Sequence, residues 1–235
     1  MNKILFFIFI TSLSFVSLNA NLIKKLKFGV VNTSGNTRNL TLNAGFGFSN
    51  KESEDIKTLF KVDVLYSQNR DTKTNERYKV KFDKSHNIIE KIISYSEINY
   101  LQNKFQGYRH QYSIGLGVQR ELFEFLNNLV KARIGLIYRE DDLINQEKKE
   151  FLYTAVKLKY KHKFNKNRFK SEIELLQNSD DTRDFETNLD IGFTFFVVGN
   201  LSFKTGFEMT FDNLPPLGKI KKIDTMTKME FVYKF

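Results

Sequence analysis

The chain ends on the alternating stretch TMTKMEFVYKF, residues 225–235. Successive side chains of a β-strand point to opposite faces, so Met229, Phe231, Tyr233 and Phe235 share one apolar face while the opposite face is mostly charged. The same alternation recurs along the whole chain, between clusters of Asn, Asp, Gly, Ser and Lys. The pattern predicts an all-β protein in which each strand has one apolar and one polar face.

The first twenty residues have the composition of a secretory signal peptide. Lys3 supplies a basic start, residues 4–10 are an unbroken apolar run, and Ala20 suits the last position before cleavage. We therefore expect residues 1–20 to be a signal peptide and 21–235 to form a single domain. A single anchoring helix is the alternative, but polar residues interrupt a run that would need about 20 apolar positions.

Strand alternation behind a secretory signal favours an antiparallel up-and-down transmembrane β-barrel in the bacterial outer membrane. Twelve strands are predicted at about 24–32, 38–48, 56–68, 75–86, 91–103, 108–120, 129–140, 150–164, 168–178, 184–196, 201–212 and 225–235. Ten strands remain possible if the fifth segment, which alternates only weakly, or the ninth segment is not a strand of its own. An even number places both chain ends in the periplasm, with short turns there and longer loops outside. A soluble periplasmic β-sandwich or barrel is the alternative fold.

The composition limits the function further. The chain of 235 residues has a formal net charge of +10 and contains no cysteine, which excludes disulfides, thiolate metal sites and lipid attachment through cysteine. A nucleic-acid binder would be expected to cluster its charge or to contain a recognisable module. Here Lys and Arg alternate with apolar residues, so the sequence predicts a polar inner wall and no nucleic-acid partner. A mean hydropathy of −0.40 fits a barrel, in which only alternate residues meet lipid.

The predicted inner wall is rich in basic residues on the seventh and eighth strands. The candidate lumen-lining residues are Lys131, Arg133, Arg139, Lys157, Lys159 and Lys161. Two interpretations stay open. Long charged side chains of both signs could pair and plug a narrow lumen, or the basic stripe could leave a pathway for anions, because charged rings select ions by sign.

Four glycines fall on the same inward face, namely Gly45, Gly47, Gly115 and Gly117. A strand glycine can mark a bend or the close approach of another group. The simpler hypothesis is that these glycines make room for a neighbouring aromatic ring or for tight curvature. The alternative is a locally widened passage.

The sequence contains no recognisable catalytic motif. His86, His110 and His162 are the only histidines, and none lies in a motif that pairs it with a serine and an orienting acid. The pairs at 141–142 and 180–181 are adjacent aspartates that could bind Ca²⁺ from a loop, although such pairs are usually solvated. We therefore expect no catalytic residue, no metal and no cofactor.

Three segments resemble a known bacterial family. Residues 32–37 (NTSGNT) resemble its first hairpin, residues 107–117 (GYRHQYSIGLG) an internal strand, and residues 211–216 (FDNLPP) its closing loop. The family is that of salt-induced outer membrane proteins, a domain-of-unknown-function β-barrel family. The resemblance implies an outer-membrane barrel associated with salt stress and supplies no catalytic residues. The lack of Trp in the first strand and the Lys-rich wall depart from the family pattern.

These observations predict a monomer that contacts outer-membrane lipid. The terminal aromatics Phe231, Tyr233 and Phe235 resemble the signal that the barrel assembly machinery recognises. The leading functional hypothesis is a non-enzymatic structural or envelope role under salt or osmotic stress. The alternatives are a narrow anion-biased channel for small solutes and, third, an outer-membrane hydrolase.

Overall fold

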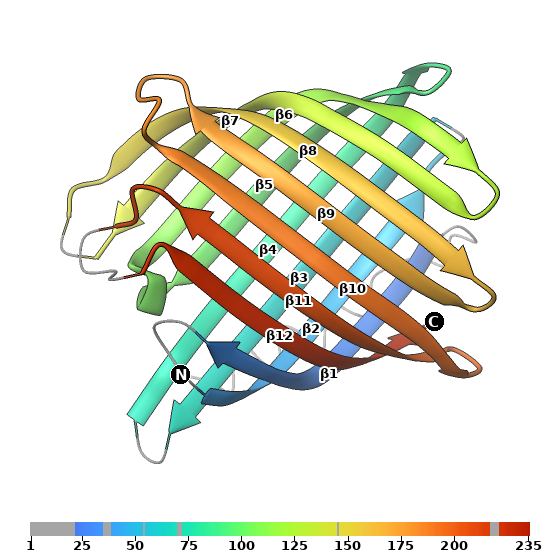
Figure 1. Ribbon diagram of the computed structural model, residues 1–235, viewed down its shortest axis with the longest axis horizontal. Helices are drawn as coiled ribbons and strands as arrows, with labels where there is room; N and C mark the ends of the chain where they lie inside the picture. Colours follow the sequence, from blue (N-terminus) through green and yellow to red (C-terminus); the bar gives the residue numbers. More distant parts are fainter. Residues whose placement is uncertain (1–21, 35–38, 54, 70–71, 145, 217–220) are drawn as a thin grey trace.

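The computed structural model is a closed barrel of twelve antiparallel strands (Figure 1). It describes residues 22–34, 39–53, 55–69, 72–144, 146–216 and 221–235. The strands are β1 (Leu22–Ser34), β2 (Asn39–Lys51), β3 (Ile56–Asn69), β4 (Thr72–Ile89), β5 (Ile92–Asn103), β6 (Tyr108–Phe125), β7 (Asn128–Leu143), β8 (Lys149–Phe164), β9 (Asn167–Asn178), β10 (Phe185–Val198), β11 (Leu201–Asp212) and β12 (Ile223–Lys234). A short 3₁₀ helix, η2 (Lys104–Gln106), lies between β5 and β6. The predicted fold class and the strand number of twelve are confirmed.

Each strand pairs with its neighbours in sequence, and β1 closes the sheet by pairing with β12. That closing register runs from Lys25 opposite Lys234 to Ser34 opposite Thr225. A closed sheet has no unpaired edge, so every strand satisfies its backbone groups against another strand, as the interior of a membrane requires. Within the described ranges no helix is long and apolar enough to cross a membrane.

The two ends of the barrel differ in their connections. Four strand pairs are joined at one end by two-residue turns, at 90–91, 126–127, 165–166 and 199–200. Each of these turns contains a residue in the left-handed region, namely Lys91, Leu126, Asn165 or Gly199, as tight hairpin turns require. The connections at the other end are longer, up to residues 213–222, except for the two residues between β3 and β4.

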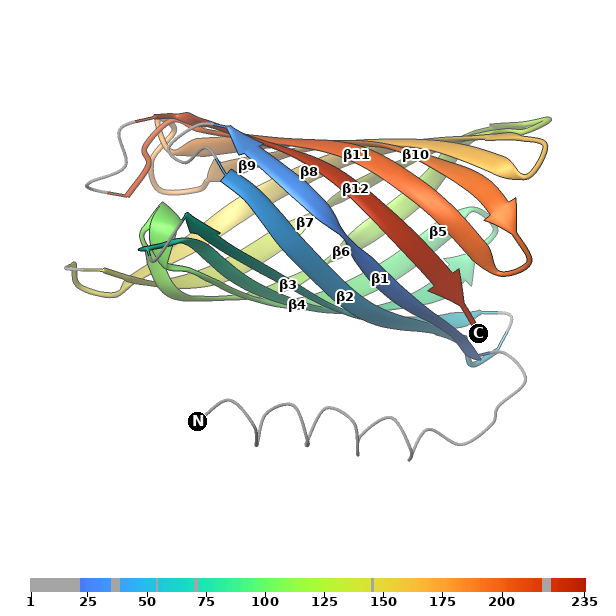
Figure 2. The same ribbon diagram turned by 90° about the horizontal axis from the view of Figure 1, so that it is seen from below.

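Short turns face the periplasm and long loops face outward in barrels of this kind. The end with the short turns is therefore the periplasmic end, and it also holds the start of β1 and the C-terminus (Figure 2). The opposite end, with the longer loops, is the external end. This arrangement matches the prediction of short turns at one end and longer loops at the other. The connection predicted at about 69–75 is the exception, because β4 already begins at Thr72.

Apolar and polar side chains alternate between the two faces of the wall. Leu116, on the outer face of β6, is 62% exposed and Ile134, on β7, is 54% exposed, whereas inward-facing Arg133 is only 8% exposed. Phe231 and Tyr233 likewise lie exposed on the outer face of β12. The outer face is thus an apolar surface for lipid, and the interior is polar.

The differences from the predicted strand ranges lie mainly at the strand ends. β6 continues to Phe125 and not 120, because the hairpin to β7 uses only two residues. β5 and β9, the two segments in question for the strand number, are complete strands, and this removes the ten-stranded alternative. Residues 1–20, the predicted signal peptide, and residues 35–38 of the first hairpin lie outside the described residues.

Candidate functional site

The six predicted lumen-lining residues lie on the inward-facing positions of β7 and β8. Lys131 stands opposite Lys159 in the strand register, and Arg133 stands opposite Lys157. Lys161 lies nearer the periplasmic end and Arg139 nearer the external end. The structure therefore places the six at different heights in the lumen, and their surroundings differ with height.

Arg133 is the centre of a polar network at mid-height. Its Nη1 donates to Asp83 Oδ2 on β4 at 2.8 Å, and its Nε donates to Gln119 Oε1 on β6 at 2.7 Å. Glu97 Oε2 on β5 lies 3.9 Å from the same Nη1. The guanidinium carbon lies 4.4 Å from the ring centroid of Tyr95, a favourable cation–π geometry. One cation thus joins side chains from three other strands.

Glycines create the space for this arrangement. A Cβ on Gly117 would collide with the Tyr95 ring, one on Gly135 would collide with the Tyr95 hydroxyl, and both would collide with the backbone of the adjacent strand. A Cβ on Gly115 would press on Glu97 and Ile137, and one on Gly45 would meet Asp63. The predicted inward glycines therefore make room for neighbouring side chains, which agrees with the simpler of the two hypotheses.

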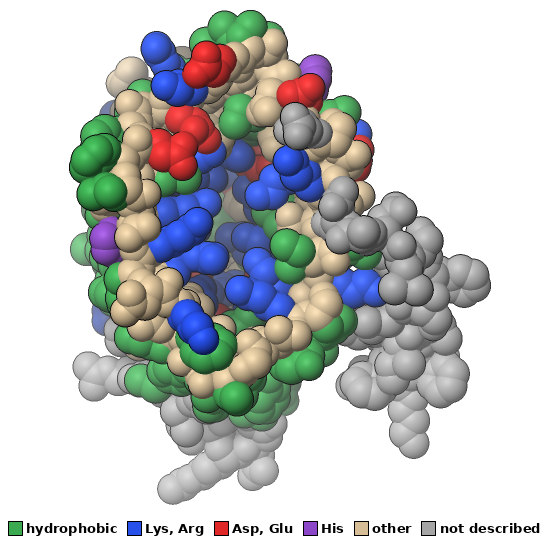
Figure 3. Space-filling view, turned by 90° about the vertical axis from the view of Figure 1, so that its right-hand side faces the viewer, with side chains coloured by type: hydrophobic (Ala, Val, Ile, Leu, Met, Phe, Trp, Pro, Cys, Tyr) green, Lys and Arg blue, Asp and Glu red, His purple; other side chains and the backbone are tan. Residues whose placement is uncertain are grey.

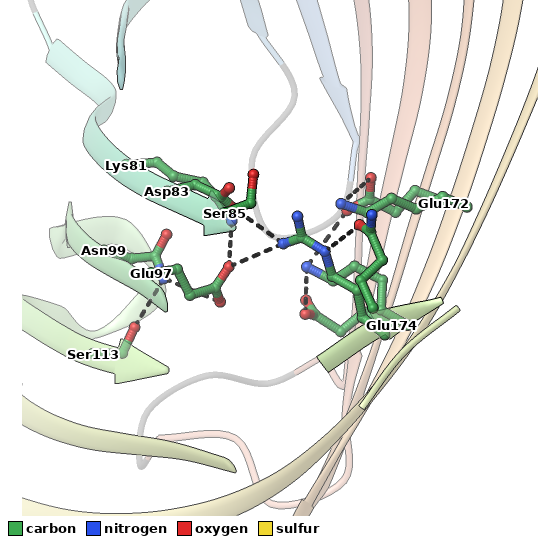
Figure 4. A network of polar contacts seen from close by, with 12 residues as sticks. Lys81, Asp83, Ser85, Glu97, Asn99, Ser113, Glu172 and Glu174 are labelled. Carbon is green, nitrogen blue, oxygen red and sulfur yellow. Dashed lines mark hydrogen bonds and ion pairs between the residues drawn. The ribbon is translucent and has the colours of Figure 1, made fainter. Parts of the chain in front are cut away.

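Lys157 and Lys159 are held by carboxylates of β9. Lys157 Nζ lies 2.6 Å from Glu174 Oε1 and 3.5 Å from Glu172 Oε1. Lys159 Nζ lies 3.7 Å from Glu172 Oε2, which also accepts from Lys170 at 3.0 Å. In Figure 4, Glu172 and Glu174 lie on one side of the network, and Lys81, Asp83 and Glu97 on the other. At mid-height, cations and carboxylates are therefore interleaved.

Nearer the external end, Arg139 is buried among acids. Its Nη1 donates to Glu186 Oε1 at 2.8 Å, its Nη2 donates to Tyr153 Oη at 2.7 Å, and its Nε lies 3.3 Å from Asp141 Oδ1. The Tyr153 hydroxyl in turn donates to Asp184 Oδ2 at 3.0 Å. These five side chains form what we call the external belt. It contains three carboxylates and a single guanidinium.

Two further contacts cross the barrel interior. Arg77 Nη2 on β4 lies 3.7 Å from Glu208 Oε2 on β11, a strand nearly opposite in the closed sheet. At the external mouth, Gln106 Nε2 of η2 donates to Asp224 Oδ2 at the start of β12, at 2.9 Å. A Cβ on Gly107 would touch the ring of Pro216. The connections β5–β6 and β11–β12 thus meet across the external mouth.

The periplasmic end has the opposite character. Lys25, Lys61 and Lys161 face inward there, and within the described part of the chain none has an Asp or Glu at ion-pair distance. Their register partners are themselves cations: Lys234 for Lys25, Lys81 for Lys61 and Lys170 for Lys161. Viewed from this end, the barrel is hollowed and lined by Lys and Arg (Figure 3).

The sequence alone does not reveal this difference between the ends. Basic residues occupy inward-facing positions on β1, β3, β4, β7, β8, β9, β11 and β12. Only the strand register decides whether a carboxylate or another cation stands opposite each of them. Tyr95 and Glu186 were likewise not identified from the sequence. The inward glycines at 115 and 117 led to the hypothesis of a neighbouring aromatic ring, but the sequence did not show that the ring is Tyr95 or that Gly135 also makes room for it. We call Gly117 and Gly135 the glycine slot.

The residues considered for catalysis and metal binding are placed as follows. His110 Nδ1 lies 3.0 Å from the Tyr100 hydroxyl, and His162 Nδ1 lies 2.9 Å from Asn128 Oδ1. In the external loop, the Arg183 guanidinium hydrogen-bonds Asp181 and lowers the pKa of that exposed carboxyl. Among the residues with described positions, no cluster of three or more His, Asp or Glu side chains could hold a metal ion.

The comparisons with known proteins agree with the fold. The family model described as "Protein of unknown function, DUF481" matches residues 26–235. No curated protein matches the chain.

Solved structures of similar fold include three outer-membrane proteins. A NanC porin structure has a TM-score of 0.61 at 8% identity, covering 89% of this chain and 100% of that chain. The KdgM porin in complex with disordered oligogalacturonate has a TM-score of 0.52 at 9% identity, covering 90% and 99%. LpxR from Salmonella typhimurium has a TM-score of 0.51 at 6% identity, covering 89% and 99%. At these identities the likeness shows the fold alone, that of a small porin-like barrel in the outer membrane.

Proposed function

Since the chain belongs to the DUF481 family, whose description assigns no activity, we propose a function from its inner wall: a non-enzymatic, narrow, anion-biased pathway for small solutes across the outer membrane. The observation that supports this most directly is the set of inward-facing lysines without carboxylate partners at the periplasmic end. Like charges directly opposite one another in a sheet are destabilising. A purely structural wall would gain stability by replacing them with neutral or acidic residues.

A lumen lined by uncompensated positive charge attracts anions and repels cations. The low-dielectric wall strengthens this effect relative to bulk water. Two structures of similar fold are named porins, and one of these was solved with oligogalacturonate, an acidic oligosaccharide. These names support the proposal by showing that such a fold can carry passage of solutes.

A structural or envelope role, including one under salt or osmotic stress, is the second candidate. It is favoured by the contact of Arg77 with Glu208 across the lumen and by the meeting of Gln106 with Asp224 across the external mouth. If these contacts close the lumen permanently, the barrel would not conduct. The two candidates therefore differ in one measurable property, the conductance.

The test is a planar-bilayer recording with the refolded barrel. We expect discrete conductance steps, and a reversal potential in a KCl gradient that shows chloride preference. Changing Lys61 and Lys161 to Gln should reduce that preference. The matched control is Lys84→Gln, which removes an exposed lysine whose partner is Glu52 at the periplasmic rim, and it should leave the selectivity unchanged.

Silent membranes from protein that shows heat-modifiable gel mobility, and is therefore folded, would contradict the proposed pathway and favour the structural role. Conducting membranes with no ion preference would contradict the role of the lysines. Both outcomes are read from the same recordings.

A further inference from the structure

The inward-facing cations near the periplasmic mouth form one group, which we call the periplasmic vestibule. Its residues are Lys25, Lys57, Lys61, Lys161, Arg168 and Lys170. We propose that the periplasmic vestibule binds compact solutes that carry several negative charges, and that these solutes enter it from the periplasmic side. This inference rests on the proposed pathway and names its substrate class and direction of access.

The strand register is the first argument. At mid-height, lysines have a carboxylate opposite them on one neighbouring strand: Lys79 stands opposite Asp63, Lys159 opposite Glu172 and Lys157 opposite Glu174. Across β7–β8, Lys159 and Lys157 stand opposite the cations Lys131 and Arg133. The residues of the periplasmic vestibule have no carboxylate opposite them on either neighbouring strand, and cations stand there instead. Lys161 faces Lys170 across the β8–β9 ladder, Lys57 faces Lys51 across β2–β3, and Lys163 at the rim faces Arg168.

The second argument is that these cations converge from opposite walls. Lys61 is on β3 and Lys170 is on β9, and these strands are on opposite sides of the closed sheet. Lys161 is on β8 and Lys25 is on β1, so the inward-facing cations come from several sides of the lumen. The view into this end shows Lys and Arg side chains gathered around the hollow (Figure 3) and not confined to one wall. A single small ligand on the axis could contact several of these ammonium groups at once.

The carboxylates near this group already form ion pairs with other lysines or with Lys170. Glu121 pairs with Lys131, and Glu172 is shared by Lys157, Lys159 and Lys170. A multiply charged anion would relieve the repulsion among the remaining ammonium groups and accept charge-assisted hydrogen bonds from them. A monovalent ion such as chloride would relieve less of it, so the geometry favours compact polyanions bearing phosphate or carboxylate groups.

The direction of access follows from the external end. The external belt carries three carboxylates around Arg139, and the external loops meet across the mouth. Polyanions approaching from outside would meet negative charge and a narrowed entrance. From the periplasm they meet an open, basic mouth (Figure 3).

Inorganic pyrophosphate is a suitable probe, titrated calorimetrically into the refolded full-length barrel in detergent micelles. We expect binding that weakens as salt is raised, because the attraction is electrostatic. The double variant Lys61→Gln with Lys161→Gln should lose roughly tenfold or more in affinity, since each change removes a charge-assisted contact. Lys79→Gln is the matched control, because it removes an inner-wall lysine that stands opposite Asp63, and it should bind as the native chain does.

The sidedness is tested in planar bilayers. The chain contains no cysteine, so Ser53→Cys places a single thiol in the periplasmic β2–β3 turn, and an impermeant thiol reagent reports the orientation of each inserted barrel. Pyrophosphate should reduce the conductance when added on the side of that thiol and have little effect from the other side.

Three outcomes would overturn the inference: no pyrophosphate binding by the native chain, equal weakening by Lys79→Gln and the double variant, or block from the external side only. Silent membranes combined with lysine-dependent binding would contradict the proposed pathway while leaving the binding site in place. Conducting membranes without pyrophosphate binding would contradict the binding site while leaving the proposed pathway in place. The two proposals can therefore fail separately.

Discussion

The external and the periplasmic halves of the lumen both carry inward-facing cations, but the surroundings of these cations differ. Arg139 and Lys161 both face inward from neighbouring strands, β7 and β8. Arg139 is enclosed by Glu186, Tyr153 and Asp141, whereas Lys161 stands opposite Lys170. The external half therefore resembles a polar protein core in which the cation is enclosed by acidic partners. The periplasmic half resembles a binding surface on which several lysines lack an acidic partner.

This difference shows that a charge on the inner wall affects the stability of the barrel differently according to whether it has partners. A buried cation whose partners are all in place contributes little net stability compared with an apolar packing, but removing one member leaves the others unpaired and costs much. An unpaired cation in a hydrated mouth is a small cost to the fold, and its removal should be tolerated. The two halves can therefore be told apart by the response of the barrel to losing a positive charge.

The largest effect is expected for Arg139→Met. This change removes the only guanidinium of the external belt and leaves the carboxylates of Asp141, Glu186 and Asp184 close together. The free energy of unfolding should fall by about 3–5 kcal/mol, the range for breaking a buried ion pair from one side. Denaturant unfolding of the refolded protein in micelles measures it.

A loss of less than about 1 kcal/mol, the value typical of exposed ion pairs, would show that Arg139 is hydrated and that the external half is not a core. Arg183→Gln is the control for this variant. Arg183 pairs with Asp181 in an exposed external loop, so its loss should not measurably change the unfolding transition.

Much of the fold follows from the sequence because the outward face of a barrel is under one constraint. Lipid requires apolar side chains at alternate positions, so the pattern in segments such as residues 129–140 indicates both the strand and its outer face. Strand ends were less predictable, as β6 shows by continuing to Phe125. A turn residue such as Asn165 lets the two strands of a hairpin stay paired up to a two-residue turn. The alternating pattern alone does not show where each strand ends.

The site was predicted only at the level of which residues face inward. The six basic candidates all lie on the inner wall, but their acidic partners come from six strands, namely β4, β5, β6, β7, β9 and β10. Which strand supplies a carboxylate depends on the register and on the diameter of the closed sheet. Arg133 illustrates this, because its principal acid, Asp83, lies three strands away.

A smaller effect is expected where the glycine slot holds Tyr95 against the wall. Gly135→Ala places a methyl group against the Tyr95 hydroxyl and the backbone of β6. Overpacking of this kind typically costs about 1–3 kcal/mol. It should also push Tyr95 away from the wall and disturb Arg133, which stacks on its ring. Thermal unfolding of the variant in micelles measures the cost.

Gly206→Ala is the matched control, because a Cβ there makes only ordinary contacts at 3.4 Å or more. It should be neutral, or stabilising by roughly 0.4–1 kcal/mol through the unfolded chain. Equal losses from both variants would mean that the effect comes from strand glycines in general and not from the Tyr95 slot.

The smallest effect is the most discriminating, because its sign is opposite to that of ordinary charge removal. Lys161→Met removes a cation that stands opposite Lys170 and has no carboxylate at ion-pair distance in the described part of the chain. Relief of cross-strand repulsion should stabilise the barrel by about 0.2–1 kcal/mol. The gain should shrink in high salt, where the repulsion is already screened.

Lys157→Met on the same strand should instead destabilise, since it leaves Glu174 without its partner at 2.6 Å. If both lysine variants lowered stability alike, Lys161 would be a structural residue. The contrast between a paired external half and an unpaired periplasmic half would then not hold.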